Sequence, residues 1–186
     1  MSKNFLIKKI FLEKSVFYSL YELFQKHLMI KLDKETFKKA FFAGIFSAFT
    51  IGVLTVLTYK SAFGLFLAGS FGSSMVLLFG FPESPFAQPR NVFFGHLVTA
   101  LVGVIFVNLI SLPIYISVAV AVGIGIFFMI LLNVVHPPAG GNPIMVIIGS
   151  VSYDYLIFPI ISGCLIIILL AVIINKLILK KNYPLK

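Results

Sequence analysis

The sequence predicts an all-α integral membrane protein: a bundle of four to six transmembrane helices, some broken or half-length, preceded by an amphipathic helix. Hydrophobic residues make up 60% of the 186 residues and charged residues only 11%, whereas soluble domains carry about 25% charged residues. Several apolar stretches also reach the roughly 20 residues that a membrane-spanning helix needs. A soluble fold is therefore excluded.

The charges gather at the two ends of the chain. Residues 1–39 hold nine lysines and four acids, and residues 176–186 hold four lysines and no acid. The 136 residues between them contain four charged side chains that sum to zero: Lys60, Glu83, Arg90 and Asp154. A nucleic-acid site needs a basic patch on a folded face, so the net charge of +9 does not predict one. Lysines that flank apolar spans mark the cytoplasmic side of a membrane, so both termini are expected in the cytoplasm, with a bacterial inner membrane as the location.

Three regions follow from this pattern: an amphipathic helix over 1–33, a transmembrane domain over 34–176 and a basic cytoplasmic tail over 177–186. In the first region, apolar residues recur at three, four or seven positions, the spacing of one helix face: Leu6, Ile10, Phe17, Leu20, Phe24 and Leu28. A basic helix of this kind lies in the lipid headgroup plane or packs on a partner subunit. Asp33 is expected to cap the next helix.

Candidate spans cover 40–59, 62–81, 92–111, 113–133 and 156–175. Residues 137–150 are apolar but short, and prolines and glycines interrupt them, which predicts a broken or half-length helix. Because both termini are expected on one side, the number of crossings must be even. Six crossings follow if 137–150 completes a span, and four follow if both 62–81 and 137–150 enter the membrane and return. We prefer six.

Two further patterns bear on the architecture. Residues 74–78 resemble residues 144–148, and each half of the chain reads as a long helix, an interrupted helix and another long helix. Three crossings per half would make an inverted repeat, a common plan in transporters. Small residues also recur at every fourth position, which lets helices approach closely in lipid and indicates a compact bundle or a homo-oligomer: Gly44/Ala48/Gly52, Gly64/Ala68/Gly72 and Gly95/Thr99/Gly103.

Residues 82–91 form a polar turn in which three prolines prevent a continuing helix. Gln88, Arg90 and Asn91 then open the span that carries His96. Arg90 offers a fixed cation whose planar fork suits oxyanions, and a helix start adds attraction for anions. The same Arg90 could instead pair with Glu83 or with a lipid phosphate.

The second polar segment surrounds Pro137 and Pro138. Irregular backbone at membrane depth is tolerated only inside protein or beside a watery cavity, so this segment predicts either a solute site or a structural kink. The candidate site residues of the chain are Ser70, Ser73, Ser74, Gln88, Arg90, Asn91, His96, His136, Pro137, Pro138, Gly140 and Asn142. The spacing of the histidines matches no compact metal motif, and no catalytic arrangement stands out, so neither a metal, a cofactor nor an enzyme is expected.

At these residues the chain resembles the HPP family of integral membrane proteins, named for the motif His136-Pro137-Pro138. The resemblance covers roughly residues 40–175 and rests on two stretches: Gly69–Ser74 through Leu77–Gly80, Ser84-Pro85, Ala87–Asn91 and Gly95-His96, then His136–Gly140. The family is usually described with four transmembrane helices. Members in plants and cyanobacteria are associated with nitrite transport. Gly141-Asn142-Pro143 departs from the small or apolar residues that are usual there, which could alter the solute preferred.

The predicted function is therefore a membrane transporter or channel for a small inorganic anion, with nitrite the leading candidate. Arg90 and the helix starts near Ser70 and Pro138 would attract the anion, and polar side chains would replace part of its hydration shell. His96 or His136 could also couple a proton. The alternatives are a non-transporting scaffold or regulatory subunit and a pore for a small uncharged solute.

Overall fold

The computed structural model describes residues 33–61 and 64–185, and within these ranges it contains helices and no strand. The chain divides into two units, Met1–Phe37 and Lys38–Lys186. In the first unit, the backbone N–H of Thr36 donates to Asp33 Oδ1 at 2.7 Å, and this backbone hydrogen bond lowers the pKa of Asp33. The predicted helix cap is therefore confirmed. The predicted amphipathic helix lies outside the described residues, apart from its last position.

Four helices are long and apolar enough to cross a membrane. They are α2 (Lys34–Lys60), α4 (Pro89–Leu109), α5 (Ile114–Leu131) and a final helix that passes through η4 (Leu156–Ile161), α7 (Ser162–Val172) and η5 (Ile173–Ile178). These helices coincide with four of the predicted spans to within a few residues at most boundaries. The all-α membrane class is confirmed.

The two remaining segments contain shorter helices. The candidate span 62–81 is interrupted, as predicted for the second element of the first half. Residues 64–69 are not helical, and the helix begins at α3 (Ser70–Met75) and continues as η1 (Val76–Gly80). Gly64 has a φ of 116°, a conformation that glycine adopts without steric cost. The predicted broken helix near Pro137 is confirmed as η3 (Pro137–Gly141) followed by α6 (Asn142–Ile148).

Contacts between distant segments show which helix ends lie together. Three of these contacts join residues near the ends of different helices: Lys39 Nζ with the Phe81 ring (4.0 Å to its centroid), Arg90 Nη2 with Leu132 O (3.4 Å), and Asn175 Nδ2 with Leu78 O (2.9 Å). They bring the early part of α2, the end of η1, the start of α4, the end of α5 and the end of the final helix to one end of the bundle. We call this the Arg90 end.

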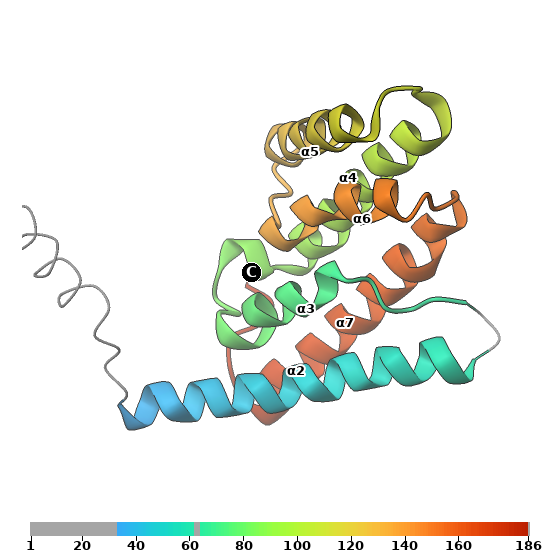
Figure 1. Ribbon diagram of the computed structural model, residues 1–186. Coiled ribbons are helices and arrows are strands. Elements are labelled where there is room, and N and C mark those ends of the chain that lie inside the picture. The colour runs from blue at the N-terminus through green and yellow to red at the C-terminus, as the bar shows by residue number, and fades with distance from the viewer. Residues whose placement is uncertain (1–32, 62–63, 186) are drawn as a thin grey trace, which may run out of the picture. The chain divides into compact units, whose positions relative to one another are not determined.

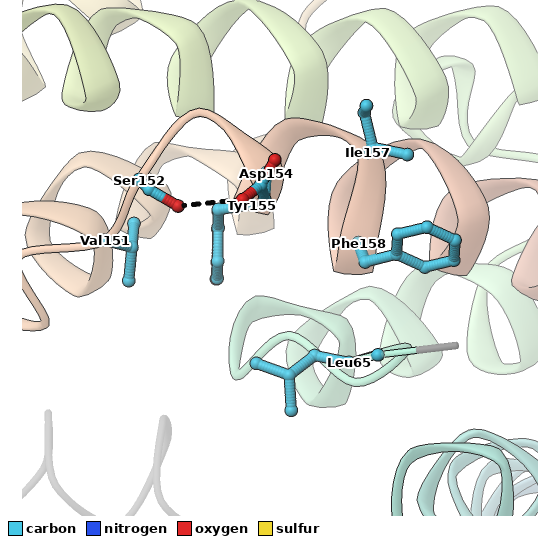
Figure 2. Close-up of a pocket in the computed structure, with 8 residues that line it drawn as sticks. Leu65, Val151, Ser152, Asp154, Tyr155, Ile157 and Phe158 are labelled. Carbon is cyan, nitrogen blue, oxygen red and sulfur yellow. Dashed lines mark hydrogen bonds between the residues drawn. The ribbon is translucent and has the colours of Figure 1, made fainter. Parts of the chain in front are cut away.

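The opposite end, which we call the Asp154 end, is marked by a pocket of about 550 Å³ between two connections (Figure 2). Its lining comes from residues 64–65 and 151–158: Gly64, Leu65, Val151, Ser152, Asp154, Tyr155, Ile157 and Phe158. Nearby, the Phe66 backbone N–H donates to Thr58 Oγ1 at 3.0 Å, and the Phe66 and Phe158 rings lie 5.3 Å apart. The end of α2 and the start of η4 therefore meet here.

Between these two ends lie the four long helices and two segments that contain shorter helices (Figure 1). Residues 64–80 run back from the Asp154 end to the Arg90 end, and residues 133–148 run the other way. The four long helices match the usual family count, and the preference for six crossings, which counts these two broken passes as well, stays a prediction.

The order within each half is long helix, broken pass, long helix. The inverted repeat suggested by this order stays a prediction. Both broken passes place their non-helical part first and their helix second. The two helices, α3 and α6, therefore start inside the bundle and run outward toward opposite ends.

Helix α4 is the central element, packed against α5, α6 and α7 (Figure 1). Its predicted small-residue stripe explains the close packing, because a Cβ on Gly103 would lie 2.9 Å from Val146 Cβ. The stripe Gly64/Ala68/Gly72 is wrong as a helix face, since its first part is not helical. In the stripe on α2, a Cβ at Gly44 or Gly52 would meet nothing within 4 Å.

Candidate functional site

A network of polar side chains fills the centre of the bundle where α3, α4, η3 and α6 meet. Ser74, His96, His136 and Asn142 are completely buried, and Ser70 is 7% exposed. These five residues were predicted as site residues, and they come from four elements separated by up to 72 positions in sequence. Polar groups buried in a membrane bundle need hydrogen-bond partners, and the network supplies them from its own members.

Ser74 is the junction of the network. Its Oγ lies 3.0 Å from His96 Nε2 and 2.9 Å from His136 Nε2, and it also lies 3.1 Å from the Ser70 carbonyl oxygen. The two imidazole rings are 5.0 Å apart between centroids. A single hydroxyl therefore joins both histidines.

Asn142 closes the network on the other side of His96. Its Nδ2 lies 3.0 Å from His96 Nδ1 and donates to the His96 carbonyl at 3.1 Å and to Thr99 Oγ1 at 3.0 Å. Its Oδ1 accepts from Ser70 Oγ at 2.6 Å. The first residue of α3 is thus bonded to the first residue of α6, so the two short helices meet inside the bundle at their N-terminal ends.

His136 connects the network to the polar turn at the Arg90 end. Its Nδ1 donates to the Phe86 carbonyl at 2.7 Å, in η2 (Pro85–Ala87). Gly95 on α4 makes this position available, because a Cβ there would lie 2.8 Å from His136 Cβ and 3.0 Å from the Val134 carbonyl. The glycine is needed for close approach of the two segments.

Gln88, Arg90 and Asn91 lie at the rim and are not brought into the buried network by any hydrogen bond that the structure describes. Gln88 Nε2 donates to the Pro82 and Ser84 carbonyls at 3.0 and 2.8 Å, and Asn91 Nδ2 donates to the Val135 carbonyl at 2.9 Å. Arg90 is exposed and bonds the Leu132 carbonyl. These side chains hold the connections at the Arg90 end, with the guanidinium facing outward.

The other predicted site residues flank the network. Ser73 is exposed, and its Oγ donates to the Ser70 carbonyl at 2.9 Å. Pro137 is exposed, while Pro138 and Gly140 are half-buried in η3. They shape the broken pass that delivers His136 and Asn142 to the network.

Three further polar residues were not predicted as functional. Thr99 is completely buried and accepts from Asn142 Nδ2, although its spacing in the sequence predicts only a place in a packing stripe. Asn175 is completely buried and donates to the Leu78 carbonyl, and Tyr183 is 2% exposed and donates to the Ala87 carbonyl at 2.9 Å. An amide inside an apolar run, as at Asn175, is a signal that could have been used.

The described residues contain no group of three or more His, Cys, Asp or Glu side chains placed to hold a metal ion. Cys164 is buried in the apolar core with a free thiol. What the site offers chemically is therefore a set of hydroxyl, amide and imidazole groups, all with partners inside the bundle.

Comparison with known proteins agrees with this architecture. The family model described as "HPP, transmembrane region" matches residues 32–184. The chain belongs to the HPP transmembrane family. Its HPP motif is the segment that carries His136 into the network, so the motif contributes both a network member and the rigid turn behind it.

Two HPP relatives are transmembrane proteins of Dictyostelium discoideum, each 36% identical to this chain. The matches cover 72% and 71% of this chain but 50% and 46% of the relatives, so the chain spans about half the length of the curated relatives it matches. No solved structure matches the chain.

Proposed function

We propose that this HPP protein is a membrane transporter or channel for a small inorganic anion, with nitrite the first candidate. The observation that carries the proposal is the hydrogen bond between Ser70 and Asn142, which joins the starts of two short helices inside the bundle. Transporters with inverted repeats build their solute sites from such interrupted helices near the membrane midplane. The HPP family resemblance supports nitrite as the solute.

The buried network supplies the groups that a small oxyanion needs when it leaves water. Hydroxyl, amide and imidazole N–H groups can replace part of a hydration shell. Their present bonds are to one another, so an incoming solute must exchange places with an internal hydrogen bond. A purely structural network would serve to fix the helices and would not exchange in this way.

We assign Arg90 the role expected from the sequence, which is to attract the anion to the Arg90 end of the bundle. His96 lies six residues further along the same helix, about 9 Å along its axis. An exposed guanidinium at that distance raises the local anion concentration without touching the buried solute. We assign binding itself to the network.

The test is nitrite flux into proteoliposomes that contain the purified protein, with nitrate and chloride as competitors. Ser74→Ala removes the junction of the network and is expected to abolish saturable flux. Ser47→Ala is the matched control, because Ser47 is also a helix serine bonded to the carbonyl four residues earlier, at 2.6 Å, and flux should persist. Flux no greater than in empty liposomes, from protein that is folded and inserted, would reject the proposal.

A pore for a small uncharged solute is the second candidate, because the network members that the structure describes carry no permanent charge. Charge reversal at Arg90 separates the two, since it should reduce anion flux and leave the passage of an uncharged solute unchanged. A scaffold or regulatory role would act through residues 1–32, outside the described part of the chain. Deleting that segment from a scaffold should abolish binding of its partner. Deleting it from a transporter should leave the flux in place.

For the location we propose a bacterial inner membrane with both termini in the cytoplasm. A shared side for the two termini is supported because Lys39 and the C-terminal residues lie at one end of the bundle. There Tyr183 donates to the Ala87 carbonyl, and the Leu185 N–H donates to Gln88 Oε1 at 2.8 Å. Labelling single cysteines placed at the Arg90 and Asp154 ends, in a Cys164→Ala background, would test this orientation. Cross-linking in the membrane would test for a homo-oligomer.

A further inference from the structure

The donor and the acceptor of each hydrogen bond in the network can be assigned, because some of the groups can only accept and others can only donate. A carbonyl only accepts, so His136 Nδ1 carries the proton that binds the Phe86 carbonyl. Neutral His136 then accepts at Nε2, and the hydrogen comes from the Ser74 hydroxyl. Asn142 Nδ2 also binds the His96 carbonyl, which fixes the orientation of that amide and makes His96 Nδ1 an acceptor.

The remaining bond follows from these assignments. His96 carries its proton at Nε2 and donates it to Ser74 Oγ at 3.0 Å. The order of donation is His96 to Ser74, Ser74 to His136, and His136 to the Phe86 carbonyl. With both rings neutral, each ring nitrogen has a partner.

The geometry contains a second arrangement that holds one more proton. The Ser74 hydroxyl can turn from His136 to the Ser70 carbonyl, which lies 3.1 Å away. Ser74 Oγ then accepts from both histidines, and His136 carries protons on both nitrogens, each with an acceptor. The rotation of one hydroxyl is the change in the network that this protonation needs.

His96 is less well placed to gain a proton, because a proton on its Nδ1 would face the Asn142 amide N–H at 3.0 Å. The other group near that nitrogen is the Ser70 hydroxyl, at a longer 3.4 Å. Two imidazolium rings with centroids 5.0 Å apart would repel one another strongly in a buried site. The network therefore accommodates one extra proton, and it belongs to His136.

The charged and titratable groups around His136 provide no counter-ion among the contacts described for its ring. On α4 these groups are His96 and the exposed Arg90, and α7 carries the buried Cys164. Helix α5 carries Tyr115, which is 74% exposed, while α3, α6 and η2 carry none. The two acids between residues 40 and 175, Glu83 and Asp154, are both exposed, and Glu83 interacts with Lys181.

We infer that His136 takes up one proton together with each anion, so that the proton and the anion move as an electroneutral pair. A buried charge without a partner is strongly disfavoured, and so is an anion in a network with no fixed cation. Each supplies the counter-charge that the other lacks. This inference rests on the proposed function and adds to it the coupling ion, the stoichiometry and the residue that carries the proton.

The experiment uses the full chain in proteoliposomes at neutral to mildly alkaline pH, where nitrite is almost entirely ionised and passive entry as the free acid is subtracted with empty liposomes. An inward proton gradient is expected to drive nitrite accumulation by the wild-type protein. A membrane potential clamped with potassium and valinomycin should leave the rate unchanged. An internal pH dye should record one proton entering with each nitrite.

His136→Gln keeps a hydrogen-bonding side chain and cannot hold the extra proton, so it should lose accumulation driven by the proton gradient; Ser47→Ala should retain it. Saturable wild-type nitrite flux that follows the membrane potential overturns the inference and leaves the proposed function standing. Proton-driven, potential-independent accumulation by His136→Gln also overturns it. No saturable flux in the wild type overturns the proposed function and the coupling together.

Discussion

The buried network and the rim at the Arg90 end are both built from polar side chains, but these side chains bond to different kinds of partner. In the network, side chains bond mainly to other side chains, as Ser74 does to both histidines. At the rim, Gln88, Arg90 and Asn91 donate to backbone carbonyls. The difference shows that polar residues close in sequence can divide between two tasks. The rim fixes the connections, and under the proposed function the network offers groups that a solute can displace.

Ser74→Ala should have the largest effect, because it removes the one group that both histidines share. Each buried polar group left without a partner costs about 1–3 kcal/mol, and this change leaves Nε2 of both rings unpaired. We expect a clear fall in the melting temperature of the detergent-solubilised protein. Ser47→Ala, whose hydroxyl bonds only its own helix, should be close to wild type. Equal melting temperatures for the two variants would mean that the network contributes no more than an ordinary helix serine.

Gly95→Ala should come next, since it tests the approach that brings His136 into the network. The new methyl group would lie 2.8 Å from His136 Cβ, and overpacking of this kind costs about 1–3 kcal/mol. Gly123→Ala on α5 is the control, because a Cβ there meets nothing within 4 Å, and its stability should be unchanged or slightly higher. A Gly95→Ala protein as stable and as active as Gly123→Ala would show that the two segments have room to separate.

Tyr183→Phe measures how much the contact between the C-terminal residues and the rim contributes to the stability of the protein. It removes the hydrogen bond to the Ala87 carbonyl and should cost about 1 kcal/mol. Burial raises the pKa of Tyr183, so its contribution is fully present below the ordinary tyrosine pKa of about 10 and is lost as the pH rises through the raised value in the folded protein. The gap in stability between wild type and Tyr183→Phe should therefore narrow in strong alkali, and a gap that widens there would contradict the assignment.

Local patterns in the sequence predicted much of this molecule. The four long helices follow from apolar length, and the cap at Asp33 follows from its side chain. Ser70, Ser74 and His96 were predicted as candidate site residues from their places beside glycines and in a span. Each of these signals is carried by neighbouring residues.

The division between network and rim could not be predicted, because it depends on contacts between distant segments. Arg90 and His96 share one helix, yet the turn of the helix sends the first to the surface and the second into the core. The place of the interruption within residues 62–81 could not be predicted for a similar reason. Residues 64–69 are not helical, and Phe66 contacts Thr58 and Phe158, which are distant in sequence or in another helix.

Arg90→Ala should have the smallest effect on stability, and its value lies in separating attraction from binding. The side chain is exposed and its hydrogen bond is long, at 3.4 Å, so the loss should stay within about 0.5 kcal/mol. Nitrite uptake should fall at low nitrite concentration and recover at saturation, because the network is intact. The deficit should also shrink as salt is added, since exposed charges are screened over about 10 Å at 0.1 M ionic strength. A loss of maximal flux that salt does not reduce would place Arg90 in contact with the bound anion and move the boundary of the site outward to the rim.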